Sequence, residues 1–368
     1  MFSLRESAIG RPIHRVAECI FCTVSDVEPL HIKALVFLYE LWHNQKTSCA
    51  IDEKFKCRFN CLDNSRPEGG RARDSMNNRL LAFSRIVMVL SCATLLGACA
   101  SAELAARASV PLVNAGAESM NRETDPILAR KAIPSQLEMI NTLIAQLPDN
   151  ANLRLRAAQG YYSYAFSFVE NKNRAWASEL YHRAFENARV ALALAGFSGN
   201  LDTMSDEQLR RELQGLNRRA VPAMFWTASC LAKWIYMNLD RPMLLAQMSK
   251  AVLLMRRVKT LDGRYYFGGP YLFFGVYYGS RPPMFGGNPE RARKEFAKAW
   301  EVTHGKLLLV DVLKAQYLER QTHNRAAFQK LLTEVRDAPP NLFPQMALAN
   351  AVAKQMAKRM LSQEEQWF

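Results

Sequence analysis

The stretch Asn288-Pro289-Glu290-Arg291-Ala292-Arg293-Lys294-Glu295-Phe296-Ala297-Lys298-Ala299 decides the fold class. Asn288 predicts a helix N-cap, Pro289 has the fixed φ of a first helical turn, and Glu290 faces the positive end of the helix dipole. Behind this start, Ala292-x3-Phe296-x2-Ala299 places a small, an aromatic and a small residue on one helix face. This spacing is typical of the second helix of a tetratricopeptide repeat, where small residues let two helices pack closely.

Two other segments carry looser copies of this pattern. Residues 184–191 give Ala-x3-Ala-x2-Ala, and residues 251–258 give Ala-x3-Met-x2-Val. Residues 155–161 and 271–278 fit the first helix of such a repeat, because each places a small residue before an aromatic one. Three copies in order predict degenerate tetratricopeptide-like helix pairs, with loops longer than those of a strict 34-residue repeat.

Helix signals continue from about residue 125 with little alternation of the strand type. Asp149-Asn150 precedes a long helical run, and Ser205 with Gln208 forms a capping box. Pro222 and Pro242 each begin a further helix, and the last helix is expected at about 345–363. The predicted class is therefore all-α, a degenerate tetratricopeptide-like helix-pair superhelix over residues 123–368.

Composition limits the classes of protein to which the chain can belong. Its 368 residues include 48 Lys and Arg against 34 Asp and Glu, a formal net charge of +14, with 49% hydrophobic and 22% charged residues. The apolar fraction excludes wholesale disorder, and the charged fraction excludes a polytopic membrane protein. The positive balance suits an anionic membrane or an acidic protein partner.

Residues 76–98 predict a lipoprotein signal peptide. Arg79 and Arg85 supply positive charge, and residues 86–96 form an apolar stretch of 11 residues. A membrane span needs about 20 apolar residues, whereas this length is typical of a signal peptide. The stretch ends in Leu96-Gly97-Ala98-Cys99, which resembles the bacterial lipobox. We therefore expect cleavage before Cys99 and lipidation of that residue; the alternative is a short core helix with an ordinary cysteine.

Cleavage at this point divides the chain. Residues 99–122 are expected to form a lipidated tether ahead of the helical domain. Ala100 and Ser101 follow the cysteine, and the absence of Asp from the second position favours the outer membrane over the inner one. The formal net charge falls from +14 to +11, because 13 basic and 10 acidic residues precede Cys99. Of the eight cysteines only Cys99 and Cys230 would remain, which leaves no intrachain disulfide if Cys99 carries lipid.

The first 75 residues have two interpretations. A secretory signal acts from the amino terminus, so we expect translation to begin at Met76 and residues 1–75 to be a gene-model extension or a disordered segment. The alternative is a small zinc module, because Cys19-x2-Cys22 and Cys57-x3-Cys61 have ligand-like spacing. The segment lacks a convincing amphipathic pattern outside residues 31–43, which favours the first interpretation.

Aromatic residues gather in two segments. Eight of the 14 residues between Tyr265 and Tyr278 are aromatic, and one face of a helix cannot bury them all. A second aromatic run lies at residues 161–168. We expect part of this aromatic surface to meet a ligand, a partner or another protomer, the alternative being a thick repeat core. The candidate residues of this ligand or partner cleft are Tyr161, Tyr164, Phe168, Trp226, Trp234, Tyr266, Tyr271, Phe273, Phe274, Tyr277, Tyr278 and Arg281.

Signals for an enzyme are poor. The expected mature chain holds only three histidines, and it has no zinc-protease, nucleophile-elbow or dinucleotide-loop motif. Gly286-Gly287 lacks the Lys-Ser/Thr of a phosphate loop, so a tight turn into the Asn288 cap is expected. Cys230 lies in an apolar helix and is predicted to be a buried, inert thiol. We expect no catalytic residue, no metal, no cofactor and no nucleic-acid partner.

Several of these motifs together resemble a known family. The aromatic helix of residues 160–170, Phe225-Trp226 with Trp234, and the segment 281–292 stand in that family's order, with 180–184 and 348–353 beside them. The family is the T component associated with tripartite ATP-independent periplasmic (TRAP) transporters. The resemblance covers residues 125–368, and residues 1–75 have no counterpart in it.

The resemblance implies an all-α periplasmic lipoprotein that forms a homotrimer and docks a soluble TRAP-type substrate-binding protein. It also implies a cleft or pore that passes a hydrophobic or organic-acid ligand, and a membrane contact through acylated Cys99. The alternative is a tetratricopeptide-type scaffold for envelope assembly, with no ligand path.

Overall fold

The computed structural model describes Ser84 and residues 102–368, and within this part of the chain all regular structure is helical. This confirms the all-α prediction. Residues 102–121 form a helix in which Ala106 and Val113 are buried. The signal peptide, Cys99 and the two interpretations of residues 1–75 concern residues outside the described part, Ser84 excepted. The following helices are α4 (Pro126–Gln146), α5 (Ala151–Tyr164), α6 (Arg174–Leu194), α7 (Asp206–Gly215), α8 (Val221–Met237), α9 (Pro242–Leu245), α10 (Met248–Asp262), α11 (Tyr265–Gly279), α12 (Pro289–Thr303), α13 (Leu309–Lys314), α14 (Arg325–Asp337) and α15 (Ala347–Ser362).

The helix starts follow the capping chemistry of the sequence. The Asn288 side chain accepts a hydrogen bond from the Arg291 N–H at 2.9 Å. Ser205 and Gln208 form the predicted reciprocal capping box of α7. Gly286 has a φ of 86°, which a residue with a side chain adopts only with strain, and the Asn288 N–H donates to the Tyr278 carbonyl at 2.9 Å. Gly286-Gly287 is therefore the tight turn that the sequence predicts.

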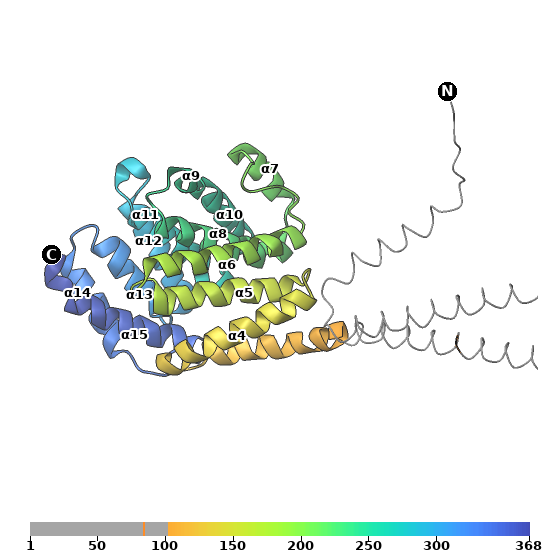
Figure 1. Ribbon diagram of the computed structural model, residues 1–368. Helices are drawn as coiled ribbons and strands as arrows, with labels where there is room; N and C mark the ends of the chain where they lie inside the picture. The colour runs from red at the N-terminus through yellow and green to blue at the C-terminus, as the bar shows by residue number, and fades with distance from the viewer. Residues whose placement is uncertain (1–83, 85–101) are drawn as a thin grey trace, which may run out of the picture. The chain divides into compact units, whose positions relative to one another are not determined.

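Successive helices pack side by side along the chain. Contacts join α4 to α5, α5 to α6, α6 to α8, α8 to α10, α10 to α11 and α11 to α12. The C-terminal α14 and α15 form a further pair, and α15 also lies against α4 (Figure 1). The helical body of residues 126–368 is thus joined at its two ends, with α8 in its interior.

The residues of the small-aromatic-small pattern lie in the core. Ala292, Phe296 and Ala299 are all buried, as are the corresponding residues of 184–191 and 251–258. Gly275 of α11 permits the close approach of Phe296, because a Cβ on Gly275 would lie 2.9 Å from the ring. The pattern therefore serves helix pairing, while the tetratricopeptide-like character of the repeat stays a prediction.

Two helices end in a wider π-helical turn. The segments η2 (Ala165–Val169) and η5 (Ala315–Glu319) continue α5 and α13. An Asn caps the helix that follows each of them, Asn173 for α6 and Asn324 for α14. An inserted π turn rotates the side chains around the helix axis and is frequent at functional sites.

Two features are absent from the described residues. No helix in this part of the chain is long and apolar enough to cross a membrane. No group of three or more His, Cys, Asp or Glu side chains in the same residues is arranged to hold a metal ion. Cys230 is fully buried in α8, and burial raises the pKa of its thiol well above the usual value, as expected of an inert cysteine.

Candidate functional site

A cavity of about 210 Å³ lies beside the central helix α8. Its walls come mainly from α8 and α11, with further residues from the end of α5, from the two π segments η2 and η5, and from α13. Most of the lining side chains are aromatic or aliphatic, and two are cationic. Such a composition, apolar walls with a few placed polar groups, is typical of a small-molecule site.

Trp226 of α8 forms the aromatic floor of the cavity. Its ring meets Tyr162 edge-on, with ring centroids 5.5 Å apart, and it meets Tyr266 edge-on at 5.0 Å. Edge-to-face contacts of this kind hold aromatic rings in fixed orientations. Burial raises the pKa of Tyr162 and of Tyr266, so both hydroxyls remain protonated at neutral pH. These groups offer an apolar, hydrogen-bonding surface and no negative charge.

A left-handed kink near the start of α11 places Tyr266 at this floor. Tyr266, Phe267 and Gly268 have φ values of 48°, 59° and 78°, and Pro270 follows two residues after the last of them. For a residue with a side chain this conformation costs roughly 1–2 kcal/mol, so the surrounding packing must hold it. The Tyr266 hydroxyl accepts a hydrogen bond from Gln159 Nε2 at 3.1 Å. Strain at a cavity wall is a common mark of a functional site.

Lys233 supplies the first cation of the cavity. Its Nζ lies 2.7 Å from Glu170 Oε2, and the same oxygen accepts a hydrogen bond from the Tyr181 hydroxyl at 2.5 Å. The ammonium also lies 4.8 Å from the centre of the Phe166 ring. Burial acts to lower the pKa of Lys233, but the Glu170 carboxylate together with Tyr162 and Tyr236 outweighs it, and the pKa is raised. Lys233 is therefore charged and already paired.

Arg281 supplies the second cation, at the end of α11. Its guanidinium lies over the Tyr277 ring, 4.1 Å from the centroid, and Tyr277 stacks in parallel with Phe273 at 6.5 Å. Burial lowers the pKa of Arg281, and the Tyr277 hydroxyl partly offsets this effect. Within the described chain no carboxylate forms an ion pair with this guanidinium.

The structure brings five of the predicted cleft residues together. Trp226, Tyr266, Phe273, Tyr277 and Arg281 all line the cavity. The other seven lie elsewhere in the helical body. They are Tyr161, Tyr164, Phe168, Trp234, Tyr271, Phe274 and Tyr278.

Helix geometry explains the division within the first aromatic run. Tyr162 and Phe166 are four residues apart, share one face and line the cavity. Tyr161, Tyr164 and Phe168 occupy the opposite side and are buried among other helices. Tyr161 accepts a hydrogen bond from Asn141 Nδ2 at 2.7 Å, so it ties α5 to α4.

The remaining predicted residues have structural surroundings. Trp234 stacks on His182 with ring centroids 4.3 Å apart and lines a separate, polar hollow. Phe274 is only 2% exposed and belongs to the core. Tyr271 lies under the Lys259 ammonium at 5.1 Å, and Tyr278 lies under Arg291 at 5.7 Å.

Several lining residues were not among the predicted set. Lys233 and its partner Glu170 are 63 residues apart in sequence, and no local motif joins them. Tyr236 and Tyr317 also line the cavity. Lys233 is the one charged residue in the run 221–237, and this signal could have identified it, because a charge in a buried helix needs a partner.

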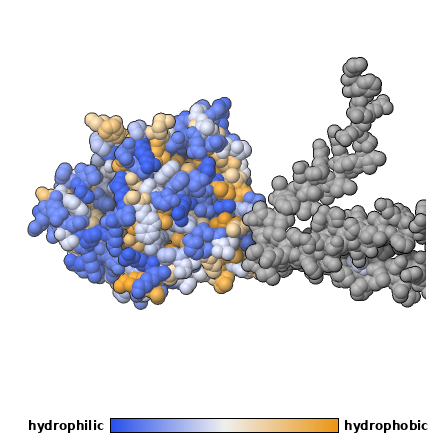
Figure 2. All heavy atoms as spheres, viewed as in Figure 1, coloured by the Kyte–Doolittle hydropathy of each residue, from blue (hydrophilic) through white to orange (hydrophobic). Residues whose placement is uncertain are grey.

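Exposed apolar side chains lie on two segments that are close in sequence to residues of the cavity wall. Met243 of α9 is 83% exposed, and Met284 and Phe285, between α11 and α12, are 82% and 69% exposed. Arg281 and Met248, a few residues from these side chains, line the cavity itself. Figure 2 shows apolar colour over both segments, on the side of the body away from α4. We call Met243, Met284 and Phe285 the apolar rim; an exposed patch of this kind often marks an interaction site.

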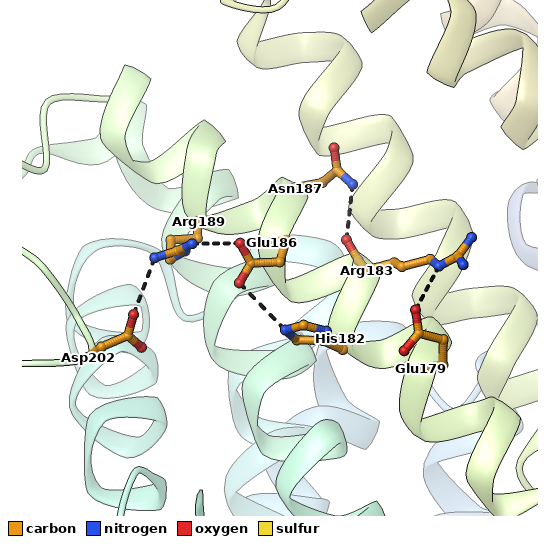
Figure 3. A network of polar contacts seen from close by, with 7 residues as sticks. All are labelled: Glu179, His182, Arg183, Glu186, Asn187, Arg189 and Asp202. Carbon is orange, nitrogen blue, oxygen red and sulfur yellow. Dashed lines mark hydrogen bonds and ion pairs between the residues drawn. The ribbon is translucent and has the colours of Figure 1, made fainter.

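Arginines on the outer face of α6 contrast with Arg281. Arg183 Nε lies 3.0 Å from Glu179, and Arg189 lies 2.6 Å from Glu186 and 3.3 Å from Asp202 (Figure 3). His182 also approaches Glu186, at 3.7 Å. These arginines are solvated and compensated by acidic neighbours, so they offer no free charge to a ligand.

Comparison with known proteins gives one family. The family model described as TRAP transporter T-component matches residues 122–368, which include the whole cavity and the apolar rim. No curated protein matches the chain.

Proposed function

Because the chain belongs to the T component family of TRAP transporters, a family of transporter accessory proteins rather than enzymes, we propose that it docks a soluble substrate-binding protein and takes up that protein's ligand. The ligand would be a hydrophobic molecule or an organic acid, held in the cavity beside α8. The cavity is the observation that carries this proposal.

The cavity walls suit a ligand with an apolar body and a polar end. Trp226, Tyr266 and Phe273 offer flat apolar surface, and Arg281 offers a cation at one part of the wall. A scaffold for envelope assembly would need neither a strained tyrosine at a cavity wall nor a guanidinium that pairs with no carboxylate of residues 102–368. These two features favour the ligand-bearing function over the scaffold.

The apolar rim supports a docking surface next to the cavity. Met243, Met284 and Phe285 are large apolar side chains that are more than two thirds exposed. Arg241, Arg291 and Arg293 lie close to them in sequence and are exposed as well, so an acidic face on the binding protein would complement the rim. A partner seated there would cover the rim side chains and lie beside Arg281.

We also propose that acylated Cys99 anchors the protein to the membrane on the periplasmic side of the cell envelope. The lipobox-like sequence supports this, and Ala100-Ser101 favours the outer membrane. A homotrimer is proposed on the family resemblance. Intact mass of the purified protein tests the anchor: a chain that begins at Cys99 and carries acyl chains is expected, and an unlipidated chain retaining residues 1–98 would contradict it.

Co-elution tests the docking. The protein is expressed with a TRAP-type substrate-binding protein from the same organism, and the complex is captured through a tag on the binding protein. We expect the unaltered protein to be captured and the double variant Met284→Ser/Phe285→Ser to be lost or strongly reduced. Ile127→Ser is the matched control, since Ile127 is 65% exposed on α4, away from the rim. Failure of the unaltered protein to co-elute would overturn the proposed function.

A further inference from the structure

The two cations that line the cavity differ in one respect, the presence of a counter-charge. Lys233 and Arg281 both contribute to its wall. A ligand with one carboxylate needs one free cation, and a ligand with two needs a second, because an ionised carboxylate is costly to bury without a partner. The number of unpaired cations therefore sets the ligand charge that the cavity can hold.

Glu170 neutralises the charge of Lys233 through an ion pair. The ammonium and the carboxylate are 2.7 Å apart, and their side chains are 15% and 11% exposed. Tyr181 donates a second hydrogen bond to the same carboxylate oxygen, which fixes Glu170 in place. Phe166, Tyr181 and Tyr236 place their rings around the ammonium at 4.8–5.6 Å. A second carboxylate brought to Lys233 would meet the negative charge of Glu170 in an apolar surrounding.

Arg281 is the cation that remains. Its neighbours are the Tyr277 ring and the stacked Phe273, and no acidic side chain of residues 102–368 pairs with it. The arginines of α6 show the usual alternative, since Arg183 and Arg189 lie within 3.3 Å of carboxylate oxygens (Figure 3). A guanidinium beside an apolar cavity presents planar donors to a carboxylate.

We propose that the cavity is selective for amphipathic anions with a single carboxylate, which Arg281 binds, and that Glu170 excludes ligands with a second carboxylate by neutralising Lys233. This inference rests on the proposed ligand-bearing function and names the ligand class. Glu170 is thus a specificity-determining residue that need not touch the ligand. The ligand's hydrocarbon part lies against Trp226 and Tyr266.

Matched acids of equal length test the charge count. Binding of octanoate and of octanedioate to the purified protein is measured by calorimetry, with intrinsic tryptophan fluorescence as a second readout. Hexanoate with hexanedioate and decanoate with decanedioate extend the series to other lengths. We expect each monoacid to bind at least about tenfold more tightly than its diacid, a difference of about 1.4 kcal/mol.

Three variants test which residues cause the preference for the monoacid. Arg281→Met is expected to lower octanoate affinity at least about tenfold. Glu170→Gln, which retains a hydrogen-bond acceptor for Tyr181, frees Lys233 and is expected to bring the diacid to the affinity of the monoacid or above it. The double variant Glu170→Gln/Lys233→Met removes the freed cation and is expected to restore the preference for the monoacid. Circular dichroism confirms that each variant is folded before binding is compared.

The outcomes separate this inference from the proposed function. Equal binding of monoacid and diacid by the unaltered protein overturns the selectivity, as does an unchanged ratio in folded Glu170→Gln. If neither acid binds while the substrate-binding protein still co-elutes, the ligand class is wrong and the docking function stands.

Discussion

The ring of Phe296 in α12 lies directly against the backbone of Gly275 in α11. A Cβ at Gly275 would lie 2.9 Å from Phe296 Cδ1, closer than side chains pack in folded proteins. The two residues come from the small and aromatic positions of the pattern on which the fold prediction depends. Their contact joins the helix that lines the cavity to the helix that follows the apolar rim.

Gly275→Ala is expected to destabilise the protein by about 1–3 kcal/mol, because the added methyl group must displace a buried ring. Phe296→Ala is expected to cost about 3–5 kcal/mol through the cavity that it leaves. The midpoint of urea unfolding measures both. Gly215→Ala is the matched control, since nothing lies within 4 Å of a Cβ there, and it should be neutral or slightly stabilising. Equal effects at Gly275 and Gly215 would contradict the close packing.

The buried pair of Lys233 and Glu170 is expected to show strong coupling. Removing one partner leaves the other charge buried, so Lys233→Met alone and Glu170→Gln alone should each lower the free energy of unfolding by about 3–5 kcal/mol. The double variant should lose less than the sum of the two single losses, because it leaves no buried charge. Additive losses in the denaturant titrations would show that the two groups do not interact.

Asp311 of α13 is expected to make stability depend on pH. Burial raises the pKa of this carboxyl from 3.8 to about 6, with a smaller opposing effect from Lys314 and a raising one from Glu334. The folded state therefore takes up the proton first as the pH falls, so the contribution of Asp311 to the free energy of unfolding rises between about pH 6 and pH 4 and is lost above pH 6.

Asp311→Asn removes this titration. We expect the variant to be more stable than the unaltered protein at pH 7–8 by about 1–3 kcal/mol, and the two to converge near pH 4. Thermal unfolding followed across this range measures the difference. A gap that stays constant with pH would show that the Asp311 carboxyl is not perturbed in the folded state.

His304 ends α12 in the left-handed conformation, with a φ of 50°. Glycine adopts this conformation without the Cβ penalty, so His304→Gly is expected to stabilise the protein by about 0.5–1 kcal/mol. Glu301→Gly, one turn earlier on the exposed surface, should instead destabilise it by about 1 kcal/mol. A loss of stability in both variants, measured by thermal unfolding, would mean that the His304 side chain makes contacts of its own.

The sequence was informative about the fold because its signals are local. Asn288 with Pro289, and Ser205 with Gln208, each fix a helix start within four residues, and the structure has both. The kink at Tyr266–Gly268 was not predicted, although Pro270 disfavours a helical conformation in the residue before it. The π segments were not predicted either, because each spans only five residues at the end of a helix, too few to alter the apolar periodicity that predicts the helix.

Only some of the residues that line the cavity could be predicted from the sequence. The many aromatic residues of α11 indicated that this helix lines the cavity. Their number alone does not show that Phe273 faces the cavity while its neighbour Phe274 faces the core. That choice depends on the rotation of α11 after its kink. The Lys233–Glu170 pair depends on how α8 lies relative to the end of η2, which no local motif encodes.

The contact between α15 and α4 fixes the number of helices in the body. In an open array a unit can be added at either end, and the array simply becomes longer. Here an added unit would separate α15 from α4. The described fold therefore cannot gain a helix pair without losing this contact. Loss of the last helix would likewise remove a neighbour of α4 at the far end of the sequence, so both termini of the body are expected to fold as one cooperative unit.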